Sequence, residues 1–238
     1  MGSRETYSQS ALATFQSCAR RFKYRYEMRL RPKRRSMALR FGTVMHDVLE
    51  RWYEGEANFI QPLFDWQREM ETLLRGGEEV GFTLEDIDKA VELIEAIMVR
   101  YEQKYRAVDF SKWKVLGTEV DFRVPFRSAP TKRFPNGRKS DWDLVGRVDL
   151  PVLDPETNTL LIVDHKTTSS ASPWETQADH ATSQQTWAYF WAATQSPEQF
   201  GLQPDELDGI GIVYNYIRKK LPSQPKILKN GMLSKSSI

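Results

Sequence analysis

The spacing of the hydrophobic residues changes along this chain, from a helical repeat of about 3.6 residues in roughly the first hundred positions to a strand repeat of two after them. Amphipathic patterns predict helices over 10–30, 41–53, 61–76, 83–106 and 183–194. Alternating or short apolar runs predict strands over 115–124, 144–152, 160–166 and 209–216. Helices followed by strands, with one more helix before the last strand, predict an α/β or α+β fold in which helices cover a mixed sheet.

The 238 residues are enough for one compact unit with a buried core. We divide it into a helical N-terminal part, residues 1–110, and a core, residues 111–238. No stretch approaches the roughly 18 apolar residues that cross a bilayer, and the N-terminal residues MGSRETYSQS lack the apolar segment of a secretory signal. The single cysteine, Cys18, has no internal disulfide partner. We therefore expect a protein of the reducing cytoplasm that makes no membrane contact.

Basic residues gather near the N-terminus, although the net charge of the whole chain is only +2. Between Arg20 and Arg40 there are ten basic residues against one acid, Glu27. A run of charge is often only a solvated surface. Here, however, aromatic residues interleave with the bases, which is the mixture that a groove for single-stranded nucleic acid requires. The candidate nucleic-acid contacts are Arg20, Arg21, Lys23 and Arg25, interleaved with Phe22, Tyr24 and Tyr26.

The apolar run LLIVDHKTTS, residues 160–169, ends in charge and follows a turn-like segment, DPETNT. If Leu153 and Leu160 are the last opposed pair of a β-hairpin, Asp149 faces Asp164 on the neighbouring strand, with Cβ atoms about 5 Å apart. Like charges in that position are destabilising, and a divalent cation would reverse the penalty. The hairpin therefore predicts a cation site.

One face of this hairpin is predicted to carry a reactive cluster. Side chains alternate along a strand, so Lys166 shares the face of Asp164 and His165 points away from it. Paired carboxylates suit a hard cation such as Mg²⁺ or Mn²⁺, and a lysine beside them can stabilise the transition state of phosphodiester hydrolysis or position the nucleophile. The alternative is a pair of ordinary strand-end aspartates, because a register slip of one residue would place them on opposite faces.

Five motifs follow one another along nearly the whole chain. They are YSQSALATFQSCARRFKYRY at 7–26, FGTVMHDVLERWYEG at 41–55, GRVDL at 146–150, VDHKT at 163–167 and QQTWAYFWA at 184–192. In this order they resemble the PD-(D/E)XK nucleases, and specifically the RecB-like exonuclease branch that includes CRISPR-associated exonucleases. The resemblance implies a restriction-endonuclease-like three-layer core, a central mixed sheet flanked by helices, with a helical N-terminal part.

The resemblance also implies roles for individual residues. His46, Asp149 and Asp164 would bind the metal, and the backbone carbonyl of His165 would add a ligand. Lys166 would be catalytic. Considered without the resemblance, His46 lies at the border of an apolar helical stripe, where a histidine is more often an ordinary border residue.

Three more positions match the family. Glu119, on the predicted strand VLGTEVDFRV, corresponds to an acidic position of the first core strand and is counted with the catalytic residues. Gln185 and Tyr189 are four residues apart and share a helix face, which the family places near the DNA strand and the metal. An aromatic helix of this kind is otherwise typical of core packing.

One feature of many relatives is missing from this sequence. They hold an iron–sulfur cluster with four cysteines, one of them at the position of Cys18. Such a cluster needs thiolate ligands, and this chain has a single cysteine. We therefore expect Mg²⁺ or Mn²⁺ as the cofactor and no iron–sulfur cluster.

The leading hypothesis is a divalent-metal-dependent DNA nuclease, an exonuclease acting on ends or single strands in DNA processing, recombination or repair. The competing hypothesis is a non-catalytic nucleic-acid-binding or assembly subunit that retains the nuclease fold. Hydrolysis of RNA or of a small phosphodiester is a third possibility, and it differs from the first only in substrate.

Overall fold

The computed structural model describes residues 5–32, 36–76, 80–127, 133, 139–170, 183–203, 205 and 207–220. Its helices are α1 (Gln9–Ser17), α2 (Ala19–Phe22), a π-helical turn (Lys23–Glu27), α3 (Met37–Tyr53), α4 (Gln61–Arg75), α5 (Leu84–Lys112), α7 (Gln184–Gln195) and a 3₁₀ turn (Pro197–Phe200). Its strands are β1 (Glu5–Ser8), β2 (Lys114–Val115), β3 (Val120–Arg127), β4 (Lys139–Val148), β5 (Leu150–Asp154), β6 (Thr159–Thr168) and β7 (Gly209–Arg218). None of the helices described is both long and apolar enough to cross a membrane.

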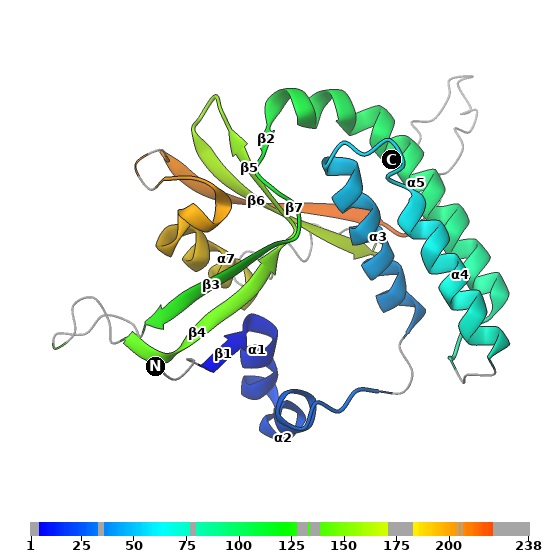
Figure 1. The fold of residues 1–238 in the computed structure, drawn as a ribbon, viewed down its shortest axis with the longest axis horizontal. Coiled ribbons are helices and arrows are strands. Elements are labelled where there is room, and N and C mark those ends of the chain that lie inside the picture. The colour runs from blue at the N-terminus through cyan, green and yellow to red at the C-terminus, as the bar shows by residue number, and fades with distance from the viewer. Residues whose placement is uncertain are drawn as a thin grey trace, which may run out of the picture.

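The strands form two mixed sheets, in the orders β1-β4-β3 and β2-β5-β6-β7 (Figure 1). Helices α3, α4 and α5 pack on one face of the four-stranded sheet, and α7 packs on the other face and on β3 and β4. Strand β6 is buried on both sides, because Leu160 and Ile162 belong to the α7 core and Val163 to the α3 core. The predicted α/β fold, with mixed sheet structure between layers of helices, is confirmed.

The hairpin of β5 and β6 has the predicted register from Leu150 to Leu160, but its ladder ends before the predicted pair of Asp149 and Asp164, because Asp149 lies in the bend that precedes β5. The two strands are antiparallel, with Leu153 opposite Leu160 and Leu150 opposite Val163. Strand β7 adds to β6 in parallel along its whole length. A strand that is central and apolar on both faces cannot shift by one residue without moving its polar end into a core, so the burial of β6 fixes this register.

Two strands that the sequence predicted as continuous, 115–124 and 144–152, are each broken by a bend, at Glu119 and at Asp149 respectively. The placement of Glu119 on a strand is therefore wrong. Its φ is +46°, which is uncommon for a residue other than glycine, and its N–H donates to the carbonyl oxygen of Asp149 over 2.8 Å. The hydrophobic alternation runs through both bends and does not reveal them. Each bend takes its strand from one sheet into the other, so two acidic side chains reach the same corner.

The single helix predicted over 10–30 is also wrong. Cys18 is extended, with φ −164° and ψ 102°, and it separates α1 from α2 and the π-helical turn. The helical spacing of apolar residues continues past Cys18, because this spacing indicates which side of a segment is buried and does not indicate a break in the helix. Ser8 caps α1 by accepting the N–H of Ala11 over 3.2 Å. The strand before it, β1, was not predicted, and it ties the N-terminal segment to β4.

Gly146 provides a test of how tightly β3 and β4 pack. It lies opposite Phe122, and a Cβ atom at Gly146 would be 2.5 Å from Cζ of the buried Phe122 ring. We expect Gly146→Ala to destabilise the fold by about 1–3 kcal/mol, the usual cost of overpacking. The matched control is Gly42→Ala in α3, where the nearest atom would be 3.5 Å away and alanine favours the helix by about 1 kcal/mol. Urea unfolding of both variants measures the difference, and equal midpoints would contradict it.

Candidate active site

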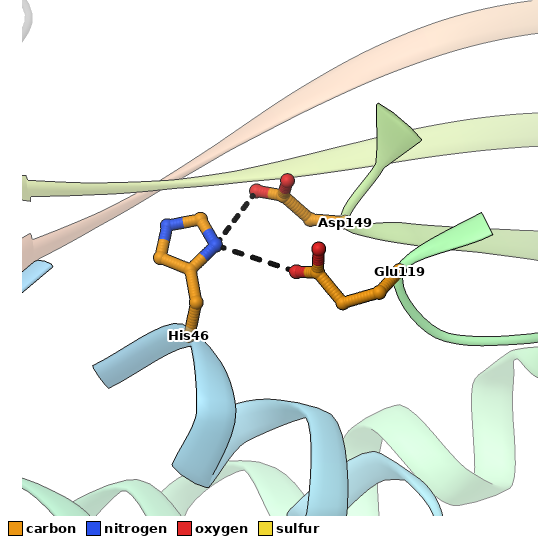
Figure 2. Close-up of side chains that lie close together, drawn as sticks. All are labelled: His46, Glu119 and Asp149. Carbon is orange, nitrogen blue, oxygen red and sulfur yellow. Dashed lines mark ion pairs between the residues drawn. The ribbon is translucent and has the colours of Figure 1, made fainter. Parts of the chain in front are cut away.

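Three side chains that could share one cation meet at the corner between the two sheets (Figure 2). His46 comes from α3, Glu119 from the bend between β2 and β3, and Asp149 from the bend between β4 and β5. His46 Nδ1 lies 3.6 Å from Glu119 Oε1 and 3.5 Å from Asp149 Oδ2. One ligand atom from each residue lies within 4.8 Å of the other two, so a single ion could contact all three.

The backbone N–H and carbonyl oxygen of His165 orient two members of this site. Its N–H donates to Asp149 Oδ2 over 2.8 Å, and its carbonyl oxygen lies 3.0 Å from His46 Nε2. Because a carbonyl oxygen only accepts, Nε2 of His46 carries a proton. Nδ1 faces the two carboxylates, and its hydrogen bond with Glu119 places a second proton there; loss of that proton would free the Nδ1 lone pair for a cation.

The electrostatics of the site favour a cation. Burial raises the pKa of Asp149 to about 6; the nearby His46 opposes this shift. The carboxylates of Asp164 and Glu119 raise it further. Burial lowers the pKa of His46, but the hydrogen bond with Glu119 and the surrounding negative charges outweigh burial, and the net shift is upward. Both shifts mean that the site lacks positive charge, which a divalent cation would supply.

A second polar group lies between β6 and α7. Lys166 Nζ is 2.5 Å from Oδ2 of Asp164, whose side chain is only 1% exposed, and it donates to Gln185 Oε1 over 3.1 Å. Oδ1 of Asp164 accepts from Gln185 Nε2 and from the Tyr189 hydroxyl, each over 3.2 Å. Burial and the charge of Asp164 raise the pKa of Tyr189, so the hydroxyl keeps its proton. The amine of Lys166 is therefore held by two partners, and the side chain remains 27% exposed.

The two predicted aspartate ligands belong to these two neighbouring groups. Asp149 lies with His46 and Glu119, whereas Asp164 is bonded to the lysine side and is absent from the three-residue group. Its charge nevertheless acts on both Asp149 and His46. A role for Asp164 as a metal ligand stays a prediction.

His165 has its backbone at the site and its side chain on the other face of the sheet. The imidazole is buried and stacks on Tyr53 of α3, which packs on the face opposite α7. Burial lowers the pKa of His165 to about 3, with smaller contributions from the charges of His46 and Lys166, so the ring is neutral. The side chain is thus placed for structure, and the carbonyl oxygen faces His46.

The basic N-terminal residues lie beside this site. The four candidate contacts are exposed and lie in α2 or the π-helical turn: Arg20, Arg21, Lys23 and Arg25. Three of them, the arginines, line a cavity of about 690 Å³ together with Tyr24 and Leu39. Leu39 also lines a cavity of about 520 Å³ that contains His46 and Glu119. The basic cavity and the candidate metal site therefore border one another.

Sequence reasoning missed three charged residues that line the smaller cavity, namely Asp47, Glu50 and Arg147. Burial raises the pKa of Asp47 and of Glu50, and the charge of Glu119 adds to both shifts. The sequence could have indicated the two acids, because Asp47 follows His46 directly and Glu50 lies one helical turn after His46. Asp47 and Glu50 add carboxyl groups to the cavity wall, and Arg147 adds a guanidinium.

The donor set fits a divalent cation. Glu119 and Asp149 supply carboxylate oxygens and His46 supplies an imidazole nitrogen, a combination compatible with Mg²⁺ or Mn²⁺. Acidic residues at two strand bends, a histidine of α3 and a lysine of β6 gather beside a basic surface, an arrangement suited to metal-dependent cleavage of a phosphodiester.

The sequence profile of the PD-(D/E)XK nuclease superfamily matches residues 6–236 of this chain, and the chain belongs to that superfamily. The superfamily that the five motifs predicted is therefore confirmed. Among curated proteins, none matches the chain. Membership implies nuclease activity with a divalent metal and a nucleic-acid substrate.

Proposed function

We propose that this protein is a deoxyribonuclease that uses Mg²⁺ or Mn²⁺, and that it acts as an exonuclease on DNA ends or single strands in DNA processing, recombination or repair. One observation carries the proposal: the group of His46, Glu119 and Asp149 lies next to a fixed and accessible lysine, Lys166. The RecB-like motifs support the exonucleolytic mode. The single cysteine supports a reducing, cytoplasmic setting without an iron–sulfur cluster.

In this proposal His46, Glu119 and Asp149 hold the cation, and Asp164 and the carbonyl oxygen of His165 complete the ligand set. When bound, a divalent cation neutralises charge at the phosphate and acidifies the attacking water. The carboxylates also orient that water by accepting its hydrogen bonds.

Lys166 has the role of binding a phosphoryl oxygen and stabilising the charge that develops there during cleavage. Asp164 and Gln185 hold the amine in place. Gln185, which donates to the hydroxyl of the buried Tyr189 over 2.7 Å, would lie beside the scissile phosphate, with Tyr189 behind it.

The lining of the basic cavity supports a path along which a DNA strand would extend away from the metal site. Its arginines can contact successive phosphates, and Tyr24 is 39% exposed, with the guanidinium of Arg20 over its ring. Charged contacts with exposed aromatic faces bind single strands with little sequence preference. This surface supports a substrate that is unpaired near the site.

Cleavage assays with matched substrates test the proposal. We expect wild-type protein to degrade end-labelled linear DNA in Mg²⁺ or Mn²⁺, to act slowly on covalently closed circles, and to stop when EDTA is added. We expect RNA of the same sequence to be cleaved more slowly. Degradation of circles as fast as linear DNA would overturn the exonuclease assignment.

Cleavage assays combined with DNA-binding measurements at several salt concentrations distinguish an enzyme from a binding subunit. Salt-sensitive DNA binding without cleavage in any divalent ion would favour the non-catalytic alternative and contradict the proposed function. Preference for RNA would keep the site chemistry and change only the substrate.

A further inference from the structure

Behind the candidate active site, buried polar side chains form a hydrogen-bonded chain that ends on the imidazole of His165. We call Tyr53, Tyr101, Asp109 and Asn215 the His165 network. Asn215 Nδ2 donates to His165 Nδ1 over 2.9 Å and to the Tyr101 hydroxyl over 2.8 Å. The Tyr101 and Tyr53 hydroxyls are 2.8 Å apart, and Tyr53 donates to Asp109 Oδ2 over 2.7 Å. From Asn215 to Asp109, each hydroxyl accepts one bond and donates the next.

Helix α3 holds His165 at two points. His46 and Tyr53 are seven residues apart, about two helical turns, so they lie on one face of α3. The imidazole of His46 bonds to the His165 carbonyl oxygen. The Tyr53 ring stacks on the His165 imidazole, with centroids 5.7 Å apart and planes inclined by 20°. Both of these contacts between α3 and β6 therefore meet at one residue of the strand.

The polarity of this network needs a reason other than packing. Tyr53, Tyr101 and His165 are 4%, 6% and 4% exposed, and apolar residues of the same shape could fill their places at little cost. A chain of hydrogen bonds between largely buried polar groups favours one arrangement of the elements that contribute to it. Here those elements are α3, α5, β6 and β7.

We propose that the His165 network is a positioning device for the metal site, acting through His165 on the separation of His46 and Asp149. The backbone of His165 makes both relevant contacts, from its N–H to Asp149 and from its carbonyl oxygen to His46. These two atoms belong to the peptide groups on either side of the His165 Cα, so anchoring the imidazole restrains that Cα and, with it, both contacts. The inference rests on the proposed metal-binding role of these two residues, and it requires no particular substrate.

Two variants remove contacts of the network without adding charge. We expect Asn215→Leu and Tyr101→Phe to raise the dissociation constant for Mn²⁺ about 10–100-fold, the loss usual when a partner behind a metal ligand is removed. Calorimetric titration with Mn²⁺, at a temperature where each variant is fully folded, measures this effect. The control is Ile217→Val, a buried change two residues from Asn215 on the same strand that touches no hydrogen bond. Wild-type Mn²⁺ affinity in both network variants would overturn the proposal.

A metal-free measurement keeps the test independent of nuclease activity. In ¹⁵N NMR spectra we expect His165 of the wild type to carry its proton on Nε2 and to have a slowly exchanging backbone N–H. Asn215→Leu should accelerate that exchange, whereas Ile217→Val should not. Unchanged exchange in Asn215→Leu would refute the positioning role. Protein that binds Mn²⁺ but cleaves no nucleic acid would overturn the proposed function and leave this inference intact.

Discussion

Replacement of Lys166 by methionine is expected to slow DNA cleavage about 10²–10³-fold, the usual loss when one group that stabilises transition-state charge is removed. Methionine keeps most of the volume of the side chain and removes its charge. We expect DNA affinity to change little, because the exposed arginines of α2 and the π-helical turn supply separate phosphate contacts. Single-turnover cleavage of labelled linear DNA and equilibrium binding in Ca²⁺ measure the two effects separately.

A double variant distinguishes catalysis from stability in this experiment. Loss of Lys166 leaves the buried carboxylate of Asp164 without its cation, so Lys166→Met should lower the melting temperature. Adding Asp164→Asn removes the unpaired charge and should recover stability but not cleavage. Lys89→Met is the matched control, because Lys89 lies on an exposed face of α5 and pairs there with Glu85. Near wild-type cleavage by Lys166→Met would place the catalytic amine elsewhere.

Replacement of Asp149 by asparagine is expected to weaken Mn²⁺ binding by more than about 100-fold, because loss of a ligand exceeds the loss typical of an outer partner. Asparagine can still accept the N–H of His165, so the local backbone should persist. Glu119→Gln should have the same direction of effect. Asp121→Asn is the control, since Asp121 lies two residues from Glu119 but pairs with Arg147 over 2.7 and 2.9 Å. Calorimetric titration measures all three.

Although Asp149→Asn should weaken Mn²⁺ binding, it should not lower the stability of the metal-free protein. Burial raises the pKa of Asp149 to about 6, above its ordinary value, so ionisation as the pH rises through 6 costs the folded state stability. Asp149→Asn avoids that cost, and at pH 7 we expect its metal-free melting temperature to equal or exceed that of the wild type. Equal Mn²⁺ affinity in the variant and the wild type would mean that the cation is held elsewhere.

Much of strand β6 could be predicted from its own residues. The turn DPETNT set the hairpin register, and strand alternation separated Lys166 and Asp164 from His165. These features depend on a period of two and on a short loop, and both are local properties of the sequence.

The helices were predicted with similar success where the pattern was long. Helices α3, α4, α5 and α7 lie where apolar residues recur with helical spacing. The pattern failed at Cys18, and it did not predict β1, a short strand whose partner is more than a hundred residues away along the chain.

The amino-acid sequence alone determined the superfamily, most of the order of the elements and the faces on which Asp164, His165 and Lys166 of β6 lie. Only the tertiary structure decided that Glu119 and Asp149 occupy bends between two sheets, that His46 completes a three-residue group with them, and that Asp164 is bonded to Lys166 and Gln185. It also revealed Asn215 and Tyr101 behind His165. The physical reason is range: periodicity records which side of its own element a residue buries, whereas the meeting of α3 with two strand bends depends on how distant elements pack around a common core.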